Sequence, residues 1–176
     1  VLRSLEHTQA LRLAGLAGGT ARNALPREAR ATFALPAGQR GALEIALATQ
    51  QADLREALRG VDEGVTLTLA AATASELMSS ADQALWLASL HAAPHGVHRR
   101  SLSVPGVVET SNNLGVVELT PRLGSCNFMV RSLLDSGSMA LADEIVSLFA
   151  LSGTAAELSG HYPGWAPNPA SPLLAR

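Results

Sequence analysis

The chain has 176 residues, of which 47% are hydrophobic and 16% are charged. This composition is typical of a folded globular protein and excludes an intrinsically disordered one. Only 3% of the residues are aromatic, and the formal net charge is −2. Because every basic residue is Arg and the sequence contains no basic stripe, we expect no nucleic-acid partner.

The cysteine content and the apolar runs limit the cellular setting. A single cysteine, Cys126, excludes an internal disulfide and favours a reducing, cytoplasmic location. No apolar run approaches the ~20 residues that cross a bilayer, so no membrane partner is expected. The first residues carry charges where a signal peptide has its apolar region. Residues 2–10 begin as a helix already under way and 171–176 stop where another could start, so we expect a piece of a longer protein.

The first half of the chain alternates between strand and helix patterns. Period-2 alternation with one polar face predicts strands, and a leucine stripe at helical spacing that ends at Gly60 predicts a helix. We read Gly15, Gly18 and Gly19 as a turn or strand bulge. The expected elements are a frayed helix over 2–10, strands over 11–14, 29–35 and 65–69, and a helix over 39–59.

The second half repeats this alternation. Thr73 and Glu76 have the spacing of a capping box, which predicts a helix that starts there and ends before Pro94. A later helix carries Leu141, Ile145 and Phe149 on one face. After the capped helix we expect a long connection over 91–106, a hairpin of strands at 116–119 and 127–131, a helix over 138–152 and a last strand over 154–162.

These elements indicate an α+β fold. A hairpin–helix–strand unit occurs twice, over 11–70 and 107–162, with the capped helix between the two copies. The pattern predicts a two-layer sandwich, with a mainly antiparallel sheet and helices on one face, as in ferredoxin-like layouts. The other face of the sheet would be left for solvent or a partner. The proline-rich stretch over 160–169 is expected to be a fixed, packed loop.

The residue types that usually carry catalysis or bind metals are sparse. His95 and His98 lie three apart beside Arg99 and Arg100, without a carboxylate nearby in sequence, so surface or hinge histidines are the better interpretation and no metal site is expected in this chain. Cys126 lies in a strand-like run without a neighbouring base, which favours a core residue. The sequence contains no Gly-x-Ser-x-Gly nucleophile motif. We therefore predict no catalytic residue here.

Three polar residues stand out as candidates for binding. Asn23 follows a glycine-rich strand end, and Asn113 lies in a polar stretch at a strand entrance. Arg131 lies late in a strand on the same face as Met129. A guanidinium on a largely apolar face needs an anionic or carbonyl partner, which a substrate carboxylate or an internal Asp or Glu would supply equally well.

Five ordered segments between 18 and 172 resemble a known family. The segment at 18–29, Gly-Gly-Thr-Ala-Arg-Asn-Ala-Leu-Pro-Arg-Glu-Ala, is similar to the lid domain of co-catalytic zinc aminopeptidases and carboxypeptidases. The remaining four segments resemble one group within that zinc metallopeptidase family, the aminoacyl-histidine dipeptidases. These segments lie at 94–97, 107–117, 130–136 and 162–172. At Asn112 the family pattern has an apolar residue.

The resemblance implies a parent enzyme that hydrolyses dipeptides ending in histidine, such as carnosine, with two zinc ions bound outside this chain. Residues 1–165 would be the lid or dimerisation domain, and 166–176 a linker back to the catalytic domain. The lid would close over the dipeptide while the catalytic domain activates a zinc-bound water. Arg131 matches the arginine that holds the substrate carboxylate, Asn23 faces the cleft, and Asn113 is a softer match. The implied partners are the dipeptide, the catalytic domain and a second copy in a homodimer.

A different class of function also fits the predicted fold. A stand-alone ferredoxin-like module could bind a protein or small ligand without catalysis. Such a module would have a complete helix at each end, whereas the start of this chain has the pattern of an interrupted helix. By itself this chain is expected to be inactive, because it contains neither the metal-ligand motifs nor the catalytic Glu-Glu pair of the family.

Overall fold

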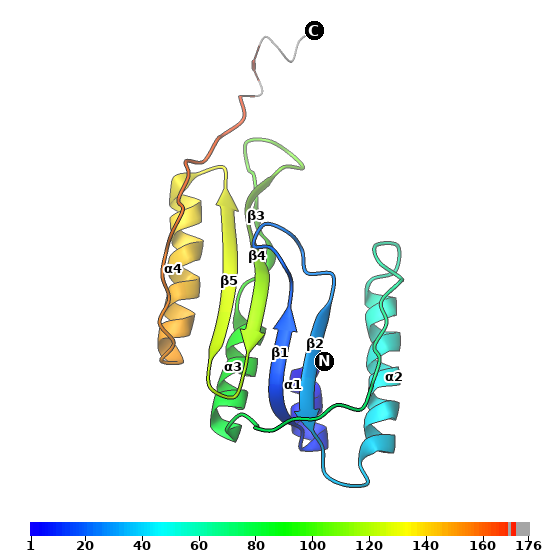
Figure 1. Ribbon diagram of the computed structural model, residues 1–176. Helices are drawn as coiled ribbons and strands as arrows, with labels where there is room; N and C mark the ends of the chain where they lie inside the picture. Colours follow the sequence, from blue (N-terminus) through cyan, green and yellow to red (C-terminus); the bar gives the residue numbers. More distant parts are fainter. Residues whose placement is uncertain (169, 172–176) are drawn as a thin grey trace. The chain divides into compact units, whose positions relative to one another are not determined.

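The computed structural model describes residues 1–168 and 170–171, with the side chains of 7–9 left out. Within this part of the chain lie four helices and five strands (Figure 1). In chain order they are α1 (Leu2–Gln9), β1 (Arg12–Gly18), β2 (Ala29–Ala34), α2 (Arg40–Ala57), α3 (Ser80–Ala92), β3 (Gly96–Arg100), β4 (Val108–Leu119), β5 (Gly124–Ser132) and α4 (Asp135–Leu151). Residue 169 and residues 172–176, in the predicted linker, lie outside the described residues.

The strands form one five-stranded antiparallel sheet in the order β2-β1-β4-β3, and β5 also pairs with β4. Strand β3 pairs with β4 in the register Gly96 with Asn112 and Val97 with Ser111. The register then shifts, so that Arg99 is opposite Thr110. The α+β, two-layer architecture predicted from the sequence is thereby confirmed.

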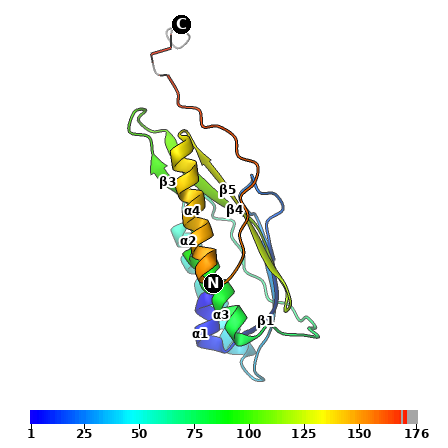
Figure 2. The ribbon, with the colours of Figure 1, turned by 90° about the vertical axis from the view of Figure 1, so that its left-hand side faces the viewer.

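The chain divides into two compact units. The first comprises Val1–Leu16, Arg30–Ala88 and Leu119–Gly124, and the second comprises Ala17–Ala29, Ser89–Glu118 and Ser125–Arg176. In the second unit, α4 lies against one face of β4 and β5, whereas no described helix of that unit covers the other face (Figure 2). None of the described helices is long and apolar enough to span a membrane.

Each unit has an aliphatic core of its own. In the first unit Leu11, Leu13 and Leu43 are almost completely buried. Gln83 is buried with them, where its Oε1 accepts from the Leu13 amide at 2.7 Å and its Nε2 donates to the Leu11 carbonyl at 2.9 Å. This side chain satisfies backbone groups that burial would otherwise leave unpaired.

The core of the second unit is built on the apolar face of α4. Leu141, Ile145 and Phe149 are buried there, as the sequence predicted. Phe128 of β5 packs on Phe149 with ring centroids 5.7 Å apart. Helix α4 is therefore fixed on β5 by side-chain packing.

Two predicted strands are wrong. Residues 65–69 and 154–162 follow α2 and α4 without any assigned strand pairing. In the first case side chains of α2 take the backbone groups that a strand would use. The Arg55 guanidinium donates to the Val65 carbonyl at 2.8 Å, and the Leu67 amide donates to Gln51 Oε1 at 2.6 Å.

The predicted start of α3 is also wrong. The helix begins at Ser80, and its cap is Ser79, six residues after the predicted cap Thr73. The Asp82 amide donates to Ser79 Oγ at 3.0 Å, and Ser79 Oγ donates to Asp82 Oδ2 at 2.6 Å. Glu76 instead pairs with Arg122 at 2.9 Å. Both serines and threonines can cap helices, so tertiary contacts decided between two similar signals.

Candidate functional site

Arg131 points to the helix-free face of the second unit. Its neighbour in β5, Ser132, contacts the Thr110 hydroxyl at 2.8 Å. A side-chain carbon added at Gly137 of α4 would lie 2.7 Å from the Ser132 hydroxyl, so Ser132 faces α4. Successive side chains of a strand point to opposite faces. Arg131 therefore points away from α4.

Asn113 shares that helix-free face. Its neighbour Asn112 lies on the same side of β4 as Thr110, and its Nδ2 donates to the carbonyl of Pro94 at 2.6 Å. The alternation along β4 then directs Asn113 to the opposite side, together with Gly115.

The loop that contains Asn23 lies over the same face. A side-chain carbon at Gly115 would be 2.6 Å from Arg22 Cα, and one at Gly19 would be 1.8 Å from the Gly115 carbonyl oxygen. The backbone at Gly19 has φ of 72°, which favours glycine. Asn23 is exposed in the turn that follows. The structure thus brings the three candidates, Asn23, Asn113 and Arg131, to one face of the second unit.

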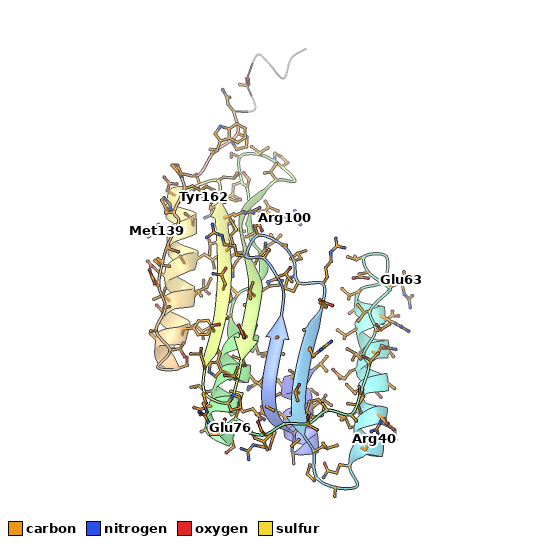
Figure 3. The ribbon with its side chains drawn as sticks, viewed as in Figure 1. Arg40, Glu63, Glu76, Arg100, Met139 and Tyr162 are labelled. Atoms are coloured by element: carbon orange, nitrogen blue, oxygen red, sulfur yellow. The ribbon has the colours of Figure 1, made fainter. Side chains whose placement is uncertain are left out.

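A groove of about 690 Å³ opens along β5. Strand β5, helix α4 and residues 155–162 form its walls, and Arg22 also lines it. Figure 3 labels Met139 of α4 and Tyr162 of the following segment, which both line this groove. Arg131 and the buried Phe149 are among the other lining residues, so the groove combines polar and apolar surface.

The Arg131 side chain is exposed and forms no ion pair within the described residues. Its Nη2 contacts the thioether sulfur of Met129 at 3.7 Å. A thioether is only a weak acceptor. The guanidinium therefore keeps most of its five donors available for an anion.

His95 and His98 occupy different structural settings. His95 Nδ1 accepts a hydrogen bond from the Leu114 amide at 3.0 Å, which joins its loop to β4. His98 lies within β3, an element that the sequence analysis had interpreted as part of a loop. No group of three or more His, Cys, Asp or Glu side chains that could hold a metal occurs among the described residues.

Cys126 lies half-buried in β5. Burial raises the pKa of its thiol to about 11, because the thiolate would lose its hydration. At neutral pH the thiol stays protonated, so the side chain is a poor nucleophile. This agrees with its interpretation as a packing residue.

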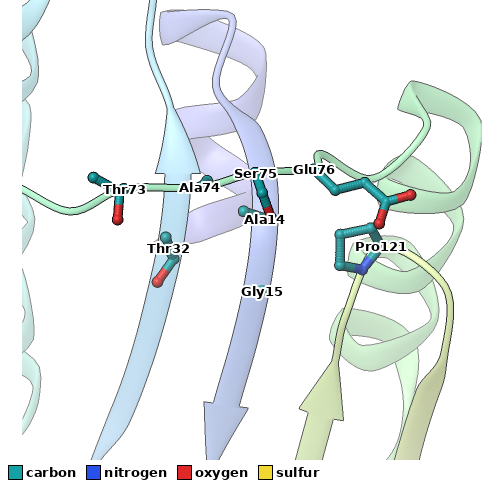
Figure 4. Close-up of a pocket in the computed structure, with 8 residues that line it drawn as sticks. All are labelled: Ala14, Gly15, Thr32, Thr73, Ala74, Ser75, Glu76 and Pro121. Atoms are coloured by element: carbon teal, nitrogen blue, oxygen red, sulfur yellow. The ribbon is translucent and has the colours of Figure 1, made fainter.

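A smaller cavity of about 290 Å³ lies in the first unit. Figure 4 shows Thr73, Ser75 and Glu76 on the segment that crosses β1 and β2 beside it. The Glu76 carboxylate is paired with Arg122 at 2.9 Å. None of the three predicted binding residues lines this cavity, whereas Arg131 lines the groove of the second unit, which is therefore the better candidate.

Two known dipeptidases are similar to this chain. No family model matches the chain. The chain is 38% identical over 165 residues to the cytosol non-specific dipeptidase of Escherichia coli (strain K12), a match that covers 93% of the chain and 34% of that relative. The crystal structure of aminoacylhistidine dipeptidase from Vibrio alginolyticus matches with a TM-score of 0.91 and 37% identity, covering 98% of this chain and 36% of that one. Over the matched residues the chain is similar to one segment of each of these two dipeptidases.

The likeness to the aminoacyl-histidine dipeptidases extends over both units, because the structural match covers 98% of the chain. The chain spans about a third of the length of these relatives. The resemblance found in the sequence is thereby confirmed.

The sequence analysis missed Arg22 as a residue of the groove. Arg22 adjoins Asn23 in the glycine-rich segment, which was the available signal. An exposed arginine in a loop gives no periodicity from which its direction can be inferred. Only the packing of the loop on Gly115 places it beside β4.

Proposed function

We propose that this chain is the lid domain of a di-zinc dipeptidase that hydrolyses dipeptides ending in histidine, such as carnosine. One observation carries the proposal: an arginine without an ion-pair partner in the described chain shares the helix-free face of its unit with Asn113 and with the loop of Asn23. The likeness to two dipeptidases supports it.

In this proposal Arg131 binds the C-terminal carboxylate of the dipeptide. A guanidinium can hold a carboxylate through two parallel N–H···O bonds, which fixes both position and orientation. Asn23 and Asn113 each carry an amide that can donate to a peptide carbonyl and accept from a peptide N–H. Together the three side chains would orient the scissile bond and help exclude water from it.

The two zinc ions of the proposed enzyme are assigned to the rest of the protein. The described residues of this chain hold no cluster of metal-ligating side chains, and they therefore do not fit a zinc site. The chain by itself would be inactive. The remaining proposed partners are the catalytic domain and a second copy of the protein, and the proposed location is the cytoplasm.

The decisive test replaces Arg131 in the full-length protein. We expect Arg131→Ala to lower kcat/KM for carnosine at least tenfold, mainly through KM, which corresponds to about 1.4 kcal/mol of lost binding. The measurement is steady-state hydrolysis with added Zn²⁺. Arg40→Ala is the matched control, because Arg40 is an exposed arginine whose partner is Glu44 of its own helix.

Two results would contradict the proposal. Unchanged kinetics in Arg131→Ala would remove the carboxylate-binding role. Hydrolysis of carnosine by this chain alone would mean that a complete active site lies within it.

A further inference from the structure

The groove along β5 contains a second arginine without an ion-pair partner. Arg22 lines it together with Arg131, and neither guanidinium takes part in an ion pair among the described residues. Glu157 is the one acidic residue among those that line the groove. Two cations that share a groove repel each other unless an anion joins them.

Three glycines fix where Arg22 lies. Its Cα would be 2.6 Å from a side-chain carbon at Gly115, so the loop rests directly on β4. Gly19, which precedes it, comes closer still to Gly115, because a side-chain carbon at Gly19 would be 1.8 Å from the Gly115 carbonyl oxygen. The far end of the Arg22 side chain lies beside Gly160: a side-chain carbon added at Gly160 would be 3.7 Å from Arg22 Nη1. The guanidinium therefore lies between β4 and the segment that forms the far wall of the groove.

We infer that Arg22 determines specificity by sensing the charge of the substrate's C-terminal side chain. The inference rests on the proposed function, in which Arg131 holds the carboxylate of that same residue. The carboxylate and the side chain branch from one Cα, so a dipeptide bound at Arg131 brings its C-terminal side chain into the groove that Arg22 lines. An acidic or neutral side chain is accepted there, whereas Lys or Arg is repelled.

The size of the effect follows from Coulomb's law in a solvated groove. Reversing a unit charge some ~6 Å from a guanidinium changes binding by roughly tenfold at a water-like dielectric constant. Because Arg22 is exposed, salt will screen this discrimination.

The test uses the full-length protein and three competitors of carnosine hydrolysis: Ala-Glu, Ala-Gln and Ala-Lys. In the unmodified protein we expect the inhibition constant of Ala-Lys to exceed that of Ala-Glu by about tenfold, with Ala-Gln between them. In Arg22→Gln the two constants should converge, and in Arg22→Lys the difference should persist. Raising the ionic strength should narrow the difference in the unmodified protein and in Arg22→Lys, but should have no such effect in Arg22→Gln.

Arg27→Gln is the matched control, because Arg27 is an exposed arginine of the same loop that does not line the groove. It should leave all three constants unchanged. If Arg22→Gln keeps the tenfold difference while Arg131→Ala weakens binding of every competitor, the inference is wrong and the proposed function stands. If Arg131→Ala changes none of them, the proposed function fails as well.

Discussion

Close approaches between backbones decide the geometry of the candidate site at the scale of single residues. Gly115 lies in the middle of β4, where a side chain would normally stabilise the strand. Its place is taken by the backbone of Ala21 and Arg22, whose oxygen atoms would each be 2.8 Å from an added side-chain carbon. The absent side chain thus leaves room for the loop that contains Asn23.

A single methyl group at this position should displace the loop. We expect Gly115→Ala to lower the free energy of unfolding by about 1–3 kcal/mol, as overpacking usually does, and to weaken substrate binding. Chemical denaturation and KM of the full-length protein measure the two effects. Gly41→Ala is the control, because no atom lies within 4 Å of its added carbon and alanine favours a helix. Equal stability of the two variants would contradict the close approach.

The sequence predicted three candidate binding residues, Asn23, Asn113 and Arg131. Only the packing of the chain shows that they share the helix-free face of the second unit. Asn113 was an uncertain candidate because it follows Asn112, which has an equivalent amide. The structure separates the two, since Asn112 is only 1% exposed and bonds to the Pro94 carbonyl. Its Oδ1 is buried without a hydrogen-bond partner, where the family pattern has an apolar side chain. Alternation along β4 thus directs Asn112 into the core and Asn113 to the helix-free face, although the two side chains are identical.

At the scale of elements, the start of α3 shows how local signals compete. Thr73 and Ser79 both precede an acidic residue by three positions. Glu76 pairs with Arg122 across the first unit, so it does not reach back to cap a helix at Thr73. Ser79 Oγ instead accepts from the Asp82 amide and donates to the Asp82 carboxylate.

The competition between the two caps can be measured directly. We expect Ser79→Ala to destabilise the protein by about 1 kcal/mol, the usual contribution of a helix cap. Thr73→Ala should have little effect, because Thr73 lies outside the helix in an exposed segment. Thermal or urea unfolding of both variants provides the comparison. A larger loss in Thr73→Ala would restore the cap predicted from the sequence.

At the scale of the whole molecule, β5 is an edge strand of the sheet. It pairs with β4 and with no other strand among the described residues. Unpaired strand edges are common sites of association. We expect the full-length protein to be a dimer, so light scattering should give twice the mass of one chain across the micromolar range. A monomer at the highest concentration would count against dimerisation.

The sequence by itself determined the fold class, the helices and most strands. These follow from apolar periodicity, which is a local property and survives in any arrangement of the elements. Strands at 65–69 and 154–162 were predicted wrongly, because alternation shows that a segment can be extended but does not supply its partner. The ordered motifs also sufficed to recognise the resemblance to dipeptidases.

Only the tertiary structure decided which residues lie together. The strand β3 was missed because its five residues, Gly-Val-His-Arg-Arg, include only one large apolar side chain. Pairing with β4 stabilises it. Arg22 lines the groove because its backbone packs directly on Gly115, which has no side chain. These two residues are 93 positions apart in the sequence. Hydrogen bonding and close packing between distant segments have no local signature. The sequence therefore predicted the candidate residues one by one, and only the tertiary structure showed that they share a face.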